Sequence, residues 1–311
     1  MFKNKDYVLA IYREGGFTKA AEKLFVSQPS LSSSIKRIEE KISAPIFDRA
    51  TSPVGLTEVG REYVKYALEI EQKEKDFERY VSDHTSLIKG KIKIGGSSFF
   101  SSFVLPALIS DFKEKHSKIE FEIFEDSTKN LMYKLNGGEL DIVIDNAINK
   151  DENITSKIYK SETLLLAVPT RFIDKVKIDK KGFSAEDVKN DLHMNAVGVS
   201  ITNFGNLPFI LLHHENDTGA RAEKIFKHGK VTPNVVFTLD QQVTAHNLSS
   251  TGLGVTFVSD TLVKYSGAEK NLVYYKLADR TINRTVYFYQ KKNRYLSLAS
   301  QKFIEYYSID K

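Results

Sequence analysis

Small polar and basic side chains recur along one face of a predicted helix that begins at Gln28. With about 100° of rotation per residue, the face opposite the apolar residues carries amide, hydroxyl and ammonium groups. Small residues let a backbone come close to base edges in a DNA groove, and these polar groups can hydrogen-bond to bases and phosphates. The residues that this pattern places near DNA are Gln28, Pro29, Ser30, Ser33 and Lys36.

The apolar residues around this face predict two short helices joined by a tight turn. Val26 and Ser27 form the turn, Ser27 is positioned to cap the second helix, and Pro29 lies in its first turn, where proline is tolerated. The buried side is expected to comprise Phe17, Ala20, Ala21, Leu24 and Phe25 in the first helix, and Leu31, Ile35, Ile38 and Ile42 in the second.

The run FTKAAEKLFVSQPSLSSSIKRIEEKI, followed by PIFDR and GLTEVG, resembles the winged helix-turn-helix signature of the LysR-type transcriptional regulators. The chain departs from the family pattern only in the turn into the wing, at Ser43-Ala44 and Pro45-Ile46. The matching positions are Phe17, Thr18, Ala20, Ala21, Leu24, Ser27, Gln28, Pro29, Ser32, Ile35, Glu39, Phe47, Arg49, Leu56, Thr57 and Gly60.

This resemblance implies a sequence-specific regulator that binds double-stranded promoter or operator DNA. It assigns Thr18 and Arg49 to contacts with the DNA backbone or minor groove, and this is favoured for Arg49 over the alternative of a solvated loop charge. It also implies assembly into a homodimer and commonly a homotetramer, with RNA polymerase as a candidate partner.

Composition is that of an ordinary globular protein with little bias toward nucleic acid. The 311 residues carry a net charge of +5, and residues 1–56 hold nine Lys/Arg against six Asp/Glu. There is no cysteine, which excludes disulfides, thiolate metal sites and cysteine nucleophiles. The sequence shows neither a long apolar run nor a signal peptide, so we expect a cytoplasmic protein without a membrane partner.

Residues 57–88 predict one long polar helix that carries an apolar stripe. Its apolar positions follow 4-3 spacing, interrupted by Lys73, and Thr57 is positioned to cap the helix. The stripe could pack against another part of the same chain. The alternative that the resemblance supports is a dimerisation helix that uses Val59, Tyr63, Tyr66, Ile70 and Phe77.

Strands alternating with helices predict an α/β fold from residue 89 to 311. Residues 170–207 lack a clear period, and no element is assigned there. The resemblance implies an effector-binding domain similar to a periplasmic binding protein. Its first lobe would comprise about 89–168 and 268–311, and its second lobe about 169–267.

Ser97, Ser98 and Thr128 each follow a predicted strand and stand near the start of a helix. Ligands of open α/β sheets bind at this place, where free backbone N–H groups and the helix dipole favour anions. These hydroxyls could instead be helix caps. With the resemblance, they predict a site for a small anionic effector, to which Phe99, Thr256 and Phe257 would contribute.

No motif for catalysis, metal binding or a cofactor rises above background. His213-His214-Glu215 with Asp217 lacks an established metal-ligand spacing, and the glycines at 95 and 96 lack the remaining features of a dinucleotide fingerprint. Lys291-Lys292-Asn293-Arg294 is interpreted as a solvated turn. We therefore expect no catalytic residue, no metal and no cofactor.

The sequence predicts a multidomain chain: an all-α winged helix-turn-helix head (1–56), a linker and dimerisation helix (57–88), and a two-lobed α/β effector-binding domain (89–311). The predicted function is transcription regulation controlled by a small effector bound between the lobes. Two alternatives stay open. The lobes could mediate protein association alone, or the chain could be an enzyme with a fused DNA-binding head, against which the absence of a nucleophile–base signature argues.

Overall fold

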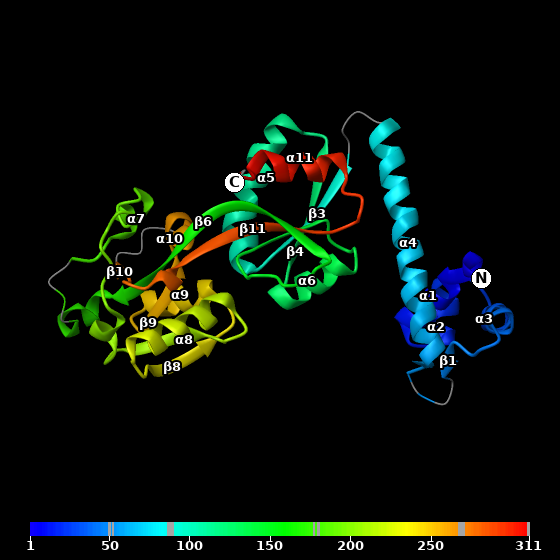
Figure 1. Ribbon diagram of the computed structural model, residues 1–311, viewed down its shortest axis with the longest axis horizontal. Coiled ribbons are helices and arrows are strands. Elements are labelled where there is room, and N and C mark those ends of the chain that lie inside the picture. Colours follow the sequence, from blue (N-terminus) through cyan, green and yellow to red (C-terminus); the bar gives the residue numbers. More distant parts are fainter. Residues whose placement is uncertain are drawn as a thin grey trace. The chain divides into compact units, whose positions relative to one another are not determined.

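The computed structural model describes residues 1–48, 51, 53–85, 90–176, 178, 181–266 and 271–309. The chain divides into two compact units, Met1–His84 and Thr85–Lys311, each with its own hydrophobic core (Figure 1). Among the described residues, none of the helices combines the length and the apolar character that crossing a lipid bilayer requires.

The first unit is a helical head with a small hairpin, followed by a long helix. Its elements are a 3-10 turn (Phe2–Asn4), α1 (Lys5–Glu14), α2 (Phe17–Lys23), α3 (Gln28–Ile42), β1 (Phe47–Asp48), β2 (Gly55–Leu56) and α4 (Glu58–Thr85). The strands β1 and β2 pair in antiparallel fashion and form the predicted wing. Gly15 ends α1 in the left-handed conformation, with φ of 67°, which favours glycine.

The apolar stripe of α3 forms the centre of the head, as predicted. Leu31, Ile35 and Ile38 are buried, and Ile42 packs against them half-buried. Phe25 was predicted to lie in the same core, and this prediction is wrong because α2 ends at Lys23. The chain turns there with a positive φ of 54° at Phe25, which leaves the ring 95% exposed.

The first part of α4 packs against the head. Tyr63 is buried in the head core, and its hydroxyl donates to the Met1 carbonyl at 3.2 Å. Thr57 Oγ1 accepts from the Gly60 N–H at 2.9 Å, which confirms the predicted cap. A Cβ at residue 60 would lie 1.9 Å from the Ile46 carbonyl oxygen, so the helix can approach this closely only with glycine there.

The second unit is a mixed sheet with helices packed against it. Its strands run in the order β4-β3-β5-β11-β6-β9-β7-β8, and β10 pairs with β6. The strands are β3 (Gly90–Gly96), β4 (Ile119–Glu125), β5 (Ile142–Asp145), β6 (Ile154–Pro169), β7 (Pro208–Leu212), β8 (Asn234–Leu239), β9 (Val255–Ser259), β10 (Leu272–Lys276) and β11 (Asn283–Lys291). The helices are α5 (Leu105–Lys115), α6 (Thr128–Asn136), α7 (Ala185–Lys189), α8 (Asp217–Gly229), α9 (Gln242–Ser250), α10 (Asp260–Tyr265) and α11 (Leu298–Tyr307).

The long strands β6 and β11 run from one lobe to the other (Figure 1). Residues 154–163 of β6 pair with β11, whereas residues from Leu164 onward pair with β9 and β10. In the first lobe β11 lies between β5 and β6. By strand pairing, β10 belongs to the second lobe, whereas the sequence placed the return to the first lobe near residue 268. The second lobe is one continuous stretch of chain inserted into the first.

Candidate DNA-contact face and effector cleft

The outer face of α3 presents the residues that the sequence selected for DNA contact. Gln28, Pro29, Ser30, Ser33 and Lys36 are all exposed, as is Thr18 near the start of α2. The Ser27 side chain accepts from the Ser30 N–H at 3.3 Å, which confirms the predicted cap. Arg49, predicted to contact DNA from the wing, lies outside the described residues.

The lysine of this face is held only weakly by the protein. The side chain of Lys36 is 76% exposed, and its Nζ lies 3.9 Å from Glu40 Oε1, at the outer limit for an ion pair. Gln28 Nε2 donates to Ser32 Oγ at 3.0 Å, which orients the amide at the first turn of the helix. The face thus holds an ammonium group and several neutral hydrogen-bonding groups in contact with solvent.

The helix α4 carries exposed apolar side chains beyond those that pack on the head. Val59, Tyr66 and Phe77 are 45%, 51% and 67% exposed, and Ile70 is half-buried. Tyr63, placed on the same stripe by sequence spacing, instead lies in the head core. Ion pairs hold α4 against α1, with Arg13 2.8 Å from Glu71 and Lys5 2.7 Å from Glu74.

In the second unit, strand ends and helix starts from both lobes meet at a small polar cavity of about 30 Å³. Ser97 follows β3, Thr128 begins α6 and Asp145 ends β5 in the first lobe. This is the edge of the sheet where α/β folds bind ligands. The lining residues are Ser97, Phe99, Phe100, Thr128, Asp145, Asn146, Asn216, Asp217, Thr218, Gln241 and Gln242.

The structure brings together some of the predicted effector residues and not others. Ser97, Phe99 and Thr128 line the cavity, whereas Ser98 is half-buried beside it and is not among the lining residues. Thr256 and Phe257 are buried within the second lobe, with the Phe257 ring 5.7 Å from that of Phe226. They do not reach the cavity because β9 lies inside the sheet. The second lobe contributes the starts of α8 and α9 instead.

Asp145 is the most deeply buried charge-bearing group of the cavity, with 3% of its surface exposed. Its Oδ2 accepts from Thr128 Oγ1 at 2.7 Å and its Oδ1 from the Ala147 N–H at 2.8 Å. Burial raises the pKa of the Asp145 carboxyl, and the charge of Asp217 raises it further. A buried carboxyl group with a raised pKa therefore lines the first-lobe side of the cavity.

A buried arginine connects the cavity to the strands that join the lobes. Arg284 on β11 donates to Glu162 Oε2 on β6 at 2.9 Å. Its Nη1 also donates to Thr218 Oγ1 at 2.9 Å and to Asp217 Oδ2 at 3.2 Å, at the start of α8. Arg221 Nε donates to the same Asp217 oxygen at 2.8 Å. The negative charge of Asp217 is thus balanced by two guanidinium groups of the protein itself, those of Arg284 and Arg221.

Sequence reasoning missed the acidic residues of the cavity. Asp145 and Asn146 stand directly after the buried strand β5, a position that could have identified them. Asp217 was considered only as part of a metal cluster with the preceding histidines. The side chains of His213 and His214 are 51% and 69% exposed, and the described residues contain no group of three or more potential metal ligands.

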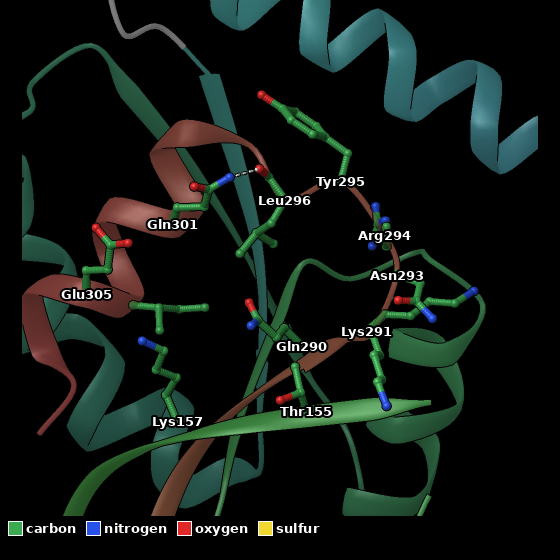
Figure 2. Close-up of a pocket in the computed structure, with 12 residues that line it drawn as sticks. Thr155, Lys157, Gln290, Lys291, Asn293, Arg294, Tyr295, Leu296, Gln301 and Glu305 are labelled. Atoms are coloured by element: carbon green, nitrogen blue, oxygen red, sulfur yellow. Dashed lines mark hydrogen bonds between the residues drawn. The ribbon is translucent and has the colours of Figure 1, made fainter. Parts of the chain in front are cut away.

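A second depression, of about 430 Å³, lies on the first lobe (Figure 2). Lys157 and Glu305 extend toward it from β6 and α11, and Gln301 donates to the Leu296 carbonyl at 2.6 Å. None of the predicted effector residues lines it. Arg294, on its edge, was interpreted as part of a solvated turn. That interpretation is wrong, because its side chain is 4% exposed and lies 3.2 Å from Asp141.

Comparison with known families decides what these two units are. Residues 3–61 match the model of the bacterial regulatory helix-turn-helix proteins of the lysR family, and residues 85–308 match that of the LysR substrate binding domain. The chain is a LysR-type transcriptional regulator. This membership confirms the family resemblance, and it assigns the chain a regulatory role, not that of an enzyme.

Relatives and solved structures agree with this LysR-type identity. The uncharacterised HTH-type transcriptional regulator YcgK of Bacillus subtilis is 28% identical over 308 residues, which cover 97% of this chain and 92% of YcgK. A full-length OxyR variant from Pseudomonas aeruginosa superposes with a TM-score of 0.68 at 19% identity, covering 98% and 93% of the two chains. Full-length CbnR in complex with its target DNA gives 0.60 at 16% identity, covering 99% and 98%. The two structures show the same fold.

Proposed function

We propose that this LysR-type regulator binds operator DNA through the outer face of α3. Gln28, Pro29, Ser30 and Ser33 would lie near base edges, and Lys36 would contact a phosphate. The observation that carries this proposal is the division of α3 into a buried apolar stripe and an exposed polar face that begins at its capped end. The structure of CbnR bound to its target DNA supports it by analogy. Thr18 would contact the DNA backbone, and the prediction for Arg49 stays untested.

We propose further that the regulator acts as a dimer formed through α4, with Val59, Tyr66, Ile70 and Phe77 at the interface. Exposed apolar side chains on one helix favour burial against a second copy of it. Assembly of dimers into tetramers and contact with RNA polymerase are further expectations of this proposal. The site of action would be the cytoplasm, where promoter DNA lies.

The effector would bind at the cavity between the lobes and change the fraction of molecules with closed lobes. The sequence predicted an anionic effector from helix starts near Ser97 and Thr128. Asp145 lies at the same place without a basic partner among the described residues, so we infer that the effector also carries a group that this carboxylate attracts.

Replacing Lys36 with alanine tests the DNA-contact face. If Lys36 contacts a phosphate, Lys36→Ala should weaken binding to the regulator's own upstream region and reduce the slope of log K against log salt by about 1. Fluorescence anisotropy across a salt series measures both. The matched control is Lys65→Ala, which removes a lysine with 58% side-chain exposure from α4. An unchanged slope in Lys36→Ala would contradict the docking of α3.

A domain that only mediated association would not respond to small molecules. Ligand-induced thermal stabilisation of the intact chain separates the two functions, because a ligand that binds only the folded state raises its stability. The following inference identifies the chemistry that such a screen should contain.

A further inference from the structure

The effector cavity contains a buried carboxylate without a positively charged partner. Each of the other buried carboxylates in the described part of the effector domain contacts a basic side chain: Asp141 contacts Arg294 at 3.2 Å, Glu162 contacts Arg284 at 2.9 Å, and Asp260 contacts the imidazole of His193 at 3.2 Å. Asp145 is equally buried, yet within the described part of the chain no lysine, arginine or histidine forms an ion pair with it. Buried charges in proteins are normally paired, so a cationic group bound here would stabilise the ionised form of Asp145.

The hydrogen bonds to Asp145 suit an ionised carboxylate. The Ala147 N–H can only donate, so it fixes Oδ1 as an acceptor, and the Thr128 hydroxyl approaches Oδ2. The backbone N–H of Asn146 also hydrogen-bonds to this carboxyl group, and all three partners are neutral. The fold therefore positions this carboxyl group at the cavity without a charged partner among the described residues, and burial raises its pKa.

The rest of the lining favours a small hydrogen-bond donor. Asp217 from the second lobe, with the side-chain amides of Asn146 and Gln241, supplies further acceptor groups. A volume of about 30 Å³ admits a group the size of a water molecule, and an ammonium group is of that size and has three N–H donors. Since the described residues include no cluster of three metal-binding side chains, an ammonium group fits the cavity better than a metal ion.

We propose that the effector of this regulator presents a primary ammonium group to the cavity, where Asp145 of the first lobe and Asp217 of the second hold it. The inference rests on the proposed function, because it uses the same cleft. An ammonium group held by both carboxylates would stabilise the ionised form of Asp145 and connect the two lobes. The effector thereby favours lobe closure.

The experiment compares matched probes on the intact chain by thermal shift and isothermal calorimetry. One arm contains the common L-amino acids, each paired with the hydroxy acid that replaces its amino group, such as alanine with lactate. A second arm contains amines without a carboxylate, such as ethanolamine and putrescine, paired with ethylene glycol and butanediol. We expect at least one amine to raise Tm and to bind at least about tenfold more tightly than its hydroxyl partner. The arm that responds identifies the source of the ammonium group.

The variant Asp145→Asn removes the charge while keeping the size of the side chain. Binding of the responding amine should weaken by about tenfold or more, and the apo protein should keep or gain thermal stability. Asp126→Asn is the control, because Asp126 lies just before the same helix and its carboxylate pairs with Lys134 at 2.7 Å on the surface. If Asp145→Asn does not fold, the comparison of amine and hydroxyl probes on the unmodified chain still tests the proposal.

Three results would overturn the proposal: equal binding of hydroxyl and amino partners, full amine affinity in Asp145→Asn, or no response to any amine. DNA binding is measured on the same preparations. If the unmodified chain does not bind operator DNA, the proposed function is wrong. If it binds operator DNA normally but recognises no amine, only the ammonium site is wrong.

Discussion

At the scale of single residues, burial decides which side chains can change charge. His246 on α9 is 1% exposed, and its Nε2 lies 2.9 Å from the Tyr274 hydroxyl, which is itself buried. Burial lowers the pKa of this imidazole to about 4. The folded protein therefore keeps His246 neutral at pH values where the unfolded chain already binds a proton.

This difference predicts a loss of stability in acid. The stability that the folded protein gains by keeping His246 neutral is fully present above pH 6.5. It is lost as the pH falls toward about 4. The free energy of unfolding should decline by as much as about 3 kcal/mol over that range through this residue. Urea denaturation at a series of pH values measures the decline, and His246→Gln should make it shallower. His214→Gln, which changes an exposed side chain, should leave it as it is.

Two single residues also show why a local sequence pattern can predict the burial of a side chain wrongly. Phe25 shares the spacing of the buried face of α2, yet α2 ends two residues earlier and the ring is exposed. Arg294 stands in a charged run typical of a turn, yet it is buried against Asp141. Spacing predicts which residues share a face only while the helix continues, and no local pattern shows a partner more than a hundred residues away.

At the scale of elements, the sequence predicted most helices and strands because their apolar periods are clear. The first half of β6 has no such period, because residues 154–162 are mostly polar and half-exposed and form a strand only by pairing with β11. A cavity does lie at the end of β3 and the start of α6, where the sequence placed the effector site, and the site itself stays a prediction. The second-lobe side of the cavity was not placed correctly, because the choice between β9 and the starts of α8 and α9 depends on how the sheet is assembled.

The helix α4 provides a prediction at this scale. Phe77 is 67% exposed, so Phe77→Asp should leave the fold of the monomer intact, but it would place a charge in the proposed dimer interface. We expect dissociation in sedimentation velocity and a loss of operator affinity of at least about tenfold, because each head then binds alone. Tyr133→Asp on α6, at a side chain with 75% exposure, is the control. A monomeric Phe77→Asp protein with full operator affinity would rule out the dependence on pairing.

At the scale of the whole effector domain, the ion pair of Arg284 and Glu162 lies where β6 and β11 cross between the lobes. Both side chains are fully buried, and Arg284 also reaches Asp217 in the cleft. Arg284 therefore connects the cavity directly to the two strands that join the lobes. The same arrangement makes the domain sensitive to the loss of one partner.

Arg284→Met should destabilise the effector domain by about 3–5 kcal/mol, because Glu162 is left charged and buried without its partner. Chemical denaturation followed by far-UV circular dichroism measures the loss. The double variant Glu162→Gln with Arg284→Met should recover part of it, since no unpaired buried charge then remains at the crossing. Equal stability of the single and double variants would show that the pair does not act through its charge.

The position of β11 between β5 and β6 also has a consequence for synthesis on the ribosome. The other strands of the first lobe emerge before residue 170, but the strand that joins them is Asn283–Lys291. The intervening second lobe takes several seconds to tens of seconds to translate at about 5–20 residues per second. During that time the facing edges of β5 and β6 lack their partner, so the nascent chain exposes unpaired strands while the second lobe, a continuous segment, can already fold.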